Sequence, residues 1–261
     1  MQKKRTKMPA KPAIFLKNLN TLEVEQLLRR EAPLFLPIGT LEAHGRHLPV
    51  GTDTLCAEKI AERLSIGLDA AIAPSLEYGI TNVLAQTSPA SFFSEELFEN
   101  FVEKIIDTFR LQGFKTIIVV NGHGGNRDAL KRIARRLSRV RPTGLAVINW
   151  WLISERFVEQ IYGCKPGGHA AVEETAAILN FFPDLVKKEN YQSESDDYTP
   201  DEGIWMYPPP GEVIIDHPGS GQPDFSAEKA AQFIDKTVDD LTIRLKKWLA
   251  SFNRIRGGLR P

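Results

Sequence analysis

The sequence predicts an α/β protein, a three-layer α/β/α sandwich with a mostly parallel central sheet. Short apolar segments alternate with amphipathic, helix-like segments through the middle of the chain, which is the order expected of a parallel sheet covered by helices. The clearest strand, Thr116–Val120, is β-branched and apolar throughout, as a strand buried on both faces should be. No internal repeat or linker interrupts residues 14–253. We therefore expect one domain there, with a flexible leader over 1–13 and a flexible tail over 254–261.

The individual elements follow from local signals. Asn20–Glu23 resembles a capping box and would begin a short helix. Ser94 is placed to cap a long helix with one apolar stripe, and Gly113 is placed to end it. The expected strands are residues 34–38, 70–73, 116–120 and 145–150, and the expected helices are residues 21–30, 54–64, 95–112, 127–139, 169–181 and 226–252.

One long stretch, residues 184–224, has no regular pattern. It contains Tyr207–Gly211 and His217–Gly221, two segments that combine proline with glycine. An irregular segment of this length usually forms a lid, a binding loop or an oligomer contact. We expect His217, within this stretch, to be a surface residue.

Composition restricts the classes of protein. Hydrophobic residues make up 42% of the 261 residues, enough to bury a core. The 33 basic and 33 acidic residues cancel, which argues against a surface for nucleic acid or an anionic membrane. Cys56 and Cys164 lie far apart and form neither a disulfide framework nor a cysteine metal site. No stretch is apolar for long enough to span a membrane. A reducing, cytoplasmic location is expected.

Three polar clusters carry the candidate chemistry, and the first follows the expected strand 34–38. Within residues 39–53 it contains Glu42, His44 and Asp53. A Glu-x-His pair offers an oxygen and a nitrogen to one metal site or to two adjacent sites, and an aspartate can bridge two metals through its two oxygens. The alternative is a polar loop satisfied by its own hydrogen bonds. His47, in the same loop, would orient the loop or contact substrate.

The second cluster, Asn121–Asn126, follows the expected strand 116–120 and holds His123 among glycines. Glycines let the backbone turn sharply and approach a ligand closely. Functional groups of a parallel sheet collect at this end of its strands. The alternative is a glycine-rich nest that binds a phosphate at a helix N-terminus.

The third cluster, Gly167–Thr175, contains His169, Glu173 and Glu174. His169 and Glu173 are four residues apart and would be neighbours on a helix. The alternative is an ordinary helix start, at which acidic residues are favoured by the macrodipole. Upstream, Trp150–Trp151 would end the strand 145–150, and one of the two indoles is a candidate to line a pocket.

Taken together, the clusters indicate a metal site. Glu42, His44, Asp53 and His123 offer only imidazole and carboxylate ligands, a mixture that suits Zn²⁺, Mn²⁺ or Fe²⁺ and not a thiolate site for soft metals. Two such ions about 3.5–4 Å apart can activate a bridging water and polarise a carbonyl group.

The segments GTLEAHGRHLPVGTD, NGHGGN and GGHAAVEET, in this order, resemble the three signatures of the creatininase (creatinine amidohydrolase) family of metal-dependent amidohydrolases. The resemblance covers about residues 32–175. It implies a three-layer α/β/α fold, a two-metal centre and, often, a hexamer. Matched by position, it makes metal ligands of Glu42, His44, Asp53 and His123, with Asp53 as the bridge. Glu174 would complete the second metal site, and His169 would lie near substrate.

Two positions depart from the creatinine-hydrolysing pattern. Members that hydrolyse creatinine carry a glutamate ligand where this chain has Gly125, and an acidic residue where it has Gly168. We expect these glycines to open space for a bulkier substrate. The NGHGGN form is typical of non-creatinine branches, among them a deformylase of a formamidopyrimidine nucleotide and a peptidase of peptide-cofactor maturation.

The expected function is metal-dependent hydrolysis of a C–N bond in an amide, formamide or cyclic amide. A metal-bridging hydroxide would attack the carbonyl carbon, and His169 or Glu174 would assist proton transfer to the leaving nitrogen. The alternatives are a two-metal phosphoesterase and a catalytically silent metal-binding subunit. The expected partners are a small amide-type substrate and further copies of the chain, most simply in a hexamer, with no nucleic acid and no membrane.

Overall fold

A computed structural model gives the arrangement of the chain. It describes residues 12–82, 84–85, 90, 93–138, 143–193, 197–198, 204, 206, 212–214 and 219–258. Most of the expected leader, residues 1–11, lies outside these ranges, as do the segment 207–211 and His217.

The central sheet is parallel throughout its described strands. The strands follow the order β1-β3-β2-β4-β5, and each neighbouring pair is parallel. The register pairs Ile38 with Asn121, so the carboxyl ends of β2 and β4 lie side by side. The strands are β1 (Ile14–Phe15), β2 (Leu34–Ile38), β3 (Ala71–Ile72), β4 (Thr116–Asn121) and β5 (Gly144–Asn149).

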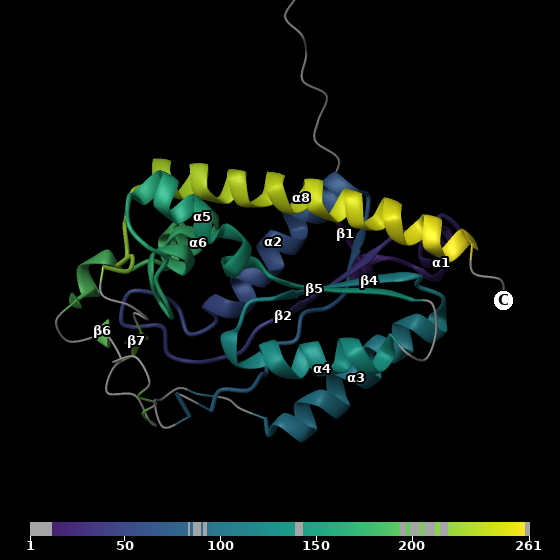
Figure 1. Ribbon diagram of the computed structural model, residues 1–261, viewed down its shortest axis with the longest axis horizontal. Coiled ribbons are helices and arrows are strands. Elements are labelled where there is room, and N and C mark those ends of the chain that lie inside the picture. Colours follow the sequence, from purple (N-terminus) through teal and green to yellow (C-terminus); the bar gives the residue numbers. More distant parts are fainter. Residues whose placement is uncertain are drawn as a thin grey trace, which may run out of the picture.

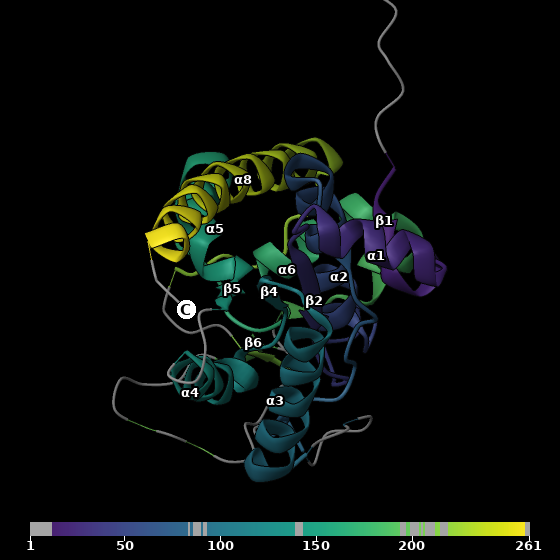
Figure 2. The same cartoon turned by 90° about the vertical axis from the view of Figure 1, so that its right-hand side faces the viewer.

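Helices cover both faces of this sheet, which confirms the predicted three-layer sandwich (Figure 1). In Figure 2, α8 lies on one side of the sheet, and α3 and α4 lie on the other. The first layer contains α2 (Thr52–Leu68), α5 (Trp150–Tyr162), α6 (Val172–Phe181) and α8 (Ala227–Gly258). The opposite layer contains α3 (Glu95–Gln112) and α4 (Arg127–Leu137), and α1 (Thr21–Arg29) adds Leu27 to its core.

The sheet separates two hydrophobic cores. Alternate residues of β4 point to opposite faces: Ile118 and Val120 pack toward α2 and α8, whereas Ile117 and Val119 pack toward α3 and α4. All four side chains are fully buried, and each contributes about 1.5–3 kcal/mol of hydrophobic stabilisation. This two-sided burial explains why the strand is apolar throughout.

The local helix signals were correct where the chain caps itself. The Asn20 side chain accepts a hydrogen bond from the Glu23 amide, and the Glu23 carboxylate accepts one from the Asn20 amide, as in a capping box. The Ser94 side chain caps α3, and Gly113 ends it in the left-handed region at φ 113°.

Three sequence-based boundaries were wrong. Trp150 begins helix α5 and does not end a strand. Helix α6 begins at Val172 and not at residue 169, because Ala170 has a left-handed φ of 57°. Residues 254–258 of the predicted tail are helical, since α8 continues to Gly258 and Arg256 forms an ion pair with Glu31.

The segment 184–224 is largely irregular where it is described, and part of it packs on the functional end of the sheet. It includes η3 (Pro183–Leu185), η4 (Lys188–Asn190) and a parallel pair, β6 (Asp197–Tyr198) with β7 (Val213–Ile214). The Ile214 amide donates to the His169 carbonyl, and the Lys187 amide donates to the His47 carbonyl. None of the described helices has the length and apolar character needed to cross a membrane.

Candidate metal centre

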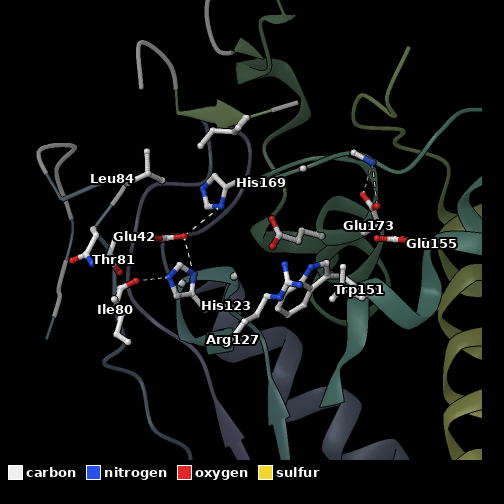
Figure 3. Close-up of a pocket in the computed structure, with 18 of the residues that line it drawn as sticks. Glu42, Ile80, Thr81, Leu84, His123, Arg127, Trp151, Glu155, His169 and Glu173 are labelled. Atoms are coloured by element: carbon white, nitrogen blue, oxygen red, sulfur yellow. Dashed lines mark hydrogen bonds and ion pairs between the residues drawn. The ribbon is translucent and has the colours of Figure 1, made fainter. Parts of the chain in front are cut away.

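The predicted ligands converge at the carboxyl edge of the sheet. Figure 3 shows three of them, Glu42, His123 and His169. The loop after β2 supplies Glu42 and His44, and the first turn of α2 supplies Asp53. The segment after β4 supplies His123. His169 lies just before α6, and Glu174 lies in the first turn of that helix.

Asp53 lies at the middle of the group and is almost fully buried. Its Oδ1 is 2.9 Å from His44 Nε2, and its Oδ2 is 2.8 Å from His123 Nδ1. Oδ2 makes no hydrogen bond of acceptable geometry among the described residues, despite that short distance. The two carboxylate oxygens therefore face two different histidines, as those of a bridging carboxylate should.

The two glutamates extend the group on either side of Asp53. Glu42 Oε1 lies 3.2 Å from His123 Nδ1 and 3.3 Å from His169 Nδ1. Glu174 Oε2 lies 3.6 Å from His44 Nε2 and accepts a hydrogen bond of 2.7 Å from the Ala170 amide. Because Ala170 fixes it, the Glu174 carboxylate is held facing His44.

Three sets of three side chains place their ligand atoms within 4.8 Å of one another. Two of these sets share Asp53: Glu42–Asp53–His123 and His44–Asp53–Glu174; the third is Glu42–His44–His169. Nitrogen and carboxylate oxygen ligands of this kind fit Zn²⁺, Mn²⁺ or Fe²⁺. The shared aspartate, with its unsatisfied buried oxygen, fits a pair of adjacent ions better than one isolated ion.

Backbone carbonyls orient all three histidines. His44 Nδ1 donates to the Glu42 carbonyl at 3.1 Å, His123 Nε2 to the Ile80 carbonyl at 2.9 Å, and His169 Nε2 to the Ala43 carbonyl at 2.5 Å. A carbonyl only accepts, so each of these nitrogens carries a proton. In the neutral ring the other nitrogen then faces the centre with its lone pair, which is how metal-binding histidines are usually held.

The protonation pattern of the group without metal has a clear cause. Burial lowers the pKa of His44, but the carboxylates of Asp53 and Glu174 outweigh it and raise that pKa to about 10. Burial opposes ionisation of Asp53, but His44 and His123 hold its pKa well below the usual range. Protons on the imidazoles thus balance the buried carboxylates. A metal ion would displace those protons as it binds.

The two asparagines of the NGHGGN segment have supporting roles that were not predicted from the sequence. Asn121 donates to the His123 carbonyl and to Asn149 Oδ1, both at 2.8 Å. Asn126 accepts from the Ile80 amide at 3.0 Å and donates to the Gly39 carbonyl at 3.2 Å. They join three loops around His123. A conspicuous pair of amides beside a candidate ligand was the signal available in the sequence.

Gly125 does not open space for substrate, contrary to expectation. A Cβ at this position would lie 2.1 Å from the Ile80 carbonyl oxygen and 2.6 Å from His123 Nε2. The glycine therefore lets the backbone pass close to the hydrogen bond that orients His123. By contrast, a Cβ at Gly124 would meet no atom within 4 Å.

This pair of glycines gives a matched test. Gly125→Ala is expected to push apart His123 and Ile80 and to weaken metal binding by about 10–100-fold, as loss of a ligand's supporting contact does. Gly124→Ala should leave metal affinity unchanged. Titration of metal-free protein with Zn²⁺ measures both. Equal affinity in the two variants would show that the Ile80 contact has no part in metal binding.

A cavity of about 540 Å³ opens beside the ligand group. His123, His169, Glu42 and Glu174 form part of its wall, and Gly168 and Ile214 also line it. Trp151 lines the cavity, whereas Trp150 is fully buried in the core. Arg127 from α4 and Glu155 from α5 complete the wall. Neither Glu155 nor Arg127 was predicted from the sequence: Glu155 lies on α5, a helix that the sequence pattern did not indicate, and Arg127 directly follows NGHGGN.

His47 supports the centre from behind and does not line the cavity. Its Nε2 forms a 3.2 Å hydrogen bond with Thr175 Oγ1, and its ring packs against Tyr191 and Phe225. Burial lowers its pKa to about 4, so the ring is neutral at pH 7. The loop-orienting role predicted for His47 fits these contacts better than contact with substrate.

Glu173 lines the cavity, but its carboxylate accepts from the Gly167 amide at 3.1 and 3.2 Å. Burial raises its pKa from 4.5 to about 8. Because the folded pKa is raised, the stability that this group contributes is full below pH 4.5 and is lost as the pH rises through 8.

Glu173→Gln should therefore stabilise the fold at high pH, since the amide stays neutral and can still accept from Gly167. The gain is expected to be small at pH 5 and on the order of a few kcal/mol at pH 9. Urea unfolding at both values measures it, with Glu228→Gln at an exposed position of α8 as the control. A gain that does not change with pH would contradict the assignment.

Comparison with known proteins identifies the family. A family profile described as creatininase, creatinine amidohydrolase, matches residues 17–245. The chain belongs to the creatininase family. The three motifs that resembled its signatures lie within the match and meet at the candidate metal centre.

Individual creatininase relatives are distant. A 3-dehydro-scyllo-inosose hydrolase of Thermotoga maritima is 24% identical over 184 residues, 67% of this chain but only 58% of that protein. A creatinine amidohydrolase of Pseudomonas putida is 25% identical over 195 residues, 67% of this chain and 74% of that one. A mycofactocin precursor peptide peptidase of Mycobacterium tuberculosis is 28% identical over 189 residues, 67% and 68% of the two chains.

Solved structures agree on the creatininase fold. A crystal structure of creatinine amidohydrolase superposes with a TM-score of 0.76 at 21% identity and covers 90% of this chain and 97% of that one. A manganese form of creatininase gives a TM-score of 0.76, and a Zn–Zn form of a creatininase mutant gives 0.74.

Proposed function

We propose that this creatininase-family chain hydrolyses a C–N bond of an amide, formamide or cyclic amide with the help of two divalent ions, Zn²⁺, Mn²⁺ or Fe²⁺. The observation that carries the proposal is the pair of ligand sets that share Asp53. Glu42, Asp53 and His123 would hold one ion, and His44, Asp53 and Glu174 the other. Manganese and Zn–Zn forms of structurally similar creatininases support this choice of metals.

When bound, such ions supply the Lewis acidity that activates a water molecule and polarises a carbonyl group. The chain itself positions the reacting groups. His169 lies at the cavity wall with Nε2 fixed on the Ala43 carbonyl. Its Nδ1, which lies 3.3 Å from Glu42 Oε1, then has the lone pair that can accept a proton and pass it to the leaving nitrogen. Glu174 is the less suitable proton carrier, because it belongs to one of the two ligand sets that share Asp53, whereas His169 belongs only to the third set.

A C–N bond is favoured over a phosphate ester by the relatives, two of which are named as an amidohydrolase and a peptidase. The intact ligand geometry argues against a silent metal-binding subunit. Cys56 and Cys164 are both free, which is compatible with the predicted cytoplasmic location.

The test combines metal analysis with a substrate panel. Protein purified without chelators should contain close to two ions per chain, and it should hydrolyse members of a panel of formamides, short peptides and cyclic amides. Turnover of phosphate esters alone would replace the proposed reaction. Metal-replete protein that hydrolyses no member of either class would favour the silent subunit. Full activity with one ion or none would contradict the binuclear centre.

We also propose that the chain forms a homo-oligomer, most simply a hexamer. The family supports this, as does the long irregular segment 184–224, parts of which are exposed at Ile204 and Met206. Light scattering at working concentration should give the mass of six chains. A monomer would contradict the proposal and would leave the segment as a lid within one chain.

A further inference from the structure

Arg127 is the only lysine or arginine among the described residues that line the cavity. It is the first residue of α4 and follows directly on the segment that carries His123. Its guanidinium group makes no ion pair and no side-chain hydrogen bond within the described ranges, and it is exposed at the wall of the cavity. Figure 3 shows Arg127 between His123 and Trp151, with its side chain reaching into the group of lining residues.

The other arginines of α4 behave differently. Arg132 pairs with Glu95 and Glu99, and Arg136 pairs with Glu99 and Glu103, so both tie α4 to α3. Arg127 has no such structural role. An arginine that faces a cavity without a partner presents a planar fork of donors that matches a carboxylate or a phosphate.

The other charged residues of the cavity wall, apart from Glu155, belong to a ligand set or have a partner. Glu42 and Glu174 belong to the ligand sets, and Glu95 pairs with Arg132 at 2.7 Å. Glu173 accepts from the Gly167 amide. Glu155, which forms no ion pair in the described structure, lies with Glu173 on the far side from His123 in Figure 3. Arg127 is thus the one positive charge without a partner among the described residues of the cavity wall.

We propose that Arg127 is a specificity-determining residue that binds an anionic group of the substrate, a carboxylate or a phosphate, at the wall of the cavity. The substrate is then an acidic amide or formamide whose negative charge lies some bonds away from the C–N bond to be cleaved. This inference rests on the proposed function, because it uses the same cavity and the same metal centre.

The test measures binding rather than turnover. Hydroxamates bind metal ions through their two oxygens, so they anchor a probe at the centre of metal-replete protein. Succinic, glutaric and adipic monohydroxamates carry a carboxylate at increasing distance, and each is compared with its neutral terminal amide by calorimetry. A 3-phosphonopropionyl hydroxamate provides the phosphate arm. At the best spacing the anionic probe should bind on the order of 10-fold more tightly than the neutral one.

Three variants test whether Arg127 causes the tighter binding of the anionic probe. Arg127→Gln should remove the 10-fold gain and leave the affinity for the neutral probe within about twofold, because the exposed side chain has no structural partner. Arg127→Lys should keep only part of the gain, since it keeps the charge but loses the fork. Arg135→Gln is the matched control: it removes the same charge from an exposed position of the same helix, outside the cavity wall, and should keep the full gain.

The outcomes separate this inference from the proposed function. A gain that is absent in the wild type at every spacing, or that survives in Arg127→Gln, would overturn the anion site even if amides are hydrolysed. An Arg127-dependent gain in a protein that hydrolyses no amide would support the anion site and reject the reaction. A larger gain for the carboxylate points to an amino-acid-like or peptide-end substrate, and a larger gain for the phosphonate points to a phosphorylated one.

Discussion

Asp53→Ala is expected to remove at least half of the bound metal and to lower kcat/KM on the order of 10³-fold or more. Asp53 faces both His44 and His123, and both ligand sets that include it lose their shared member. Activation of water and polarisation of the carbonyl together contribute several kcal/mol, and each 1.36 kcal/mol corresponds to a factor of ten in rate. Elemental analysis and steady-state kinetics on the best substrate of the panel measure the two losses.

The fold should survive this change. Without Asp53, His44 still faces the Glu174 carboxylate at 3.6 Å and His123 still faces the Glu42 carboxylate at 3.2 Å, so no unpaired charge is left in the core. The buried strands β2 and β4 remain intact. Asp128→Ala is the control, because Asp128 occupies the first turn of α4 as Asp53 occupies that of α2, but is exposed. Unchanged turnover and metal content in Asp53→Ala, with Asp128→Ala equally unaffected, would remove Asp53 from the site.

Creatinine is expected to be a poor substrate, with kcat/KM on the order of 10²–10⁴-fold below that of the best formamide or peptide, as is usual when a positioned acid or base is missing. Gly125 supplies no carboxylate, and its surroundings exclude one, since even a Cβ would clash with Ile80. Gly168 lines the cavity without an acidic side chain beside His169.

The measurement is a direct comparison of creatinine with formamides and short peptides on metal-replete enzyme. Gly125→Glu should not improve creatinine turnover, because the added side chain would displace the Ile80 carbonyl that orients His123. If the wild type hydrolyses creatinine efficiently, a different carboxylate supplies the missing role. Glu173 is then the first candidate, because it lines the same cavity.

Much of this fold is determined locally. The strand Thr116–Val120 must be covered on both faces because it is apolar on both, and the caps at Asn20, Ser94 and Gly113 depend on contacts within a few residues. The candidate metal ligands, which are histidines and carboxylates, could also be recognised in short segments of the sequence. Parallel strands bring their carboxyl ends to one edge, so Glu42 and His123 could be expected to meet although 80 residues of chain lie between them.

Only the tertiary structure decided the details that bear on chemistry. Helix α5 could not be separated from strand β5 because the apolar run Leu145–Ile153 is interrupted only by Asn149, with no glycine or proline at the boundary. The lone pair that each histidine presents depends on carbonyls such as that of Ile80, which comes from a different segment than His123. The sequence motif NGHGGN ends one residue before Arg127, and nothing local tells that arginine apart from Arg132. Their difference is set by what each side chain faces, a cavity in one case and the glutamates of α3 in the other.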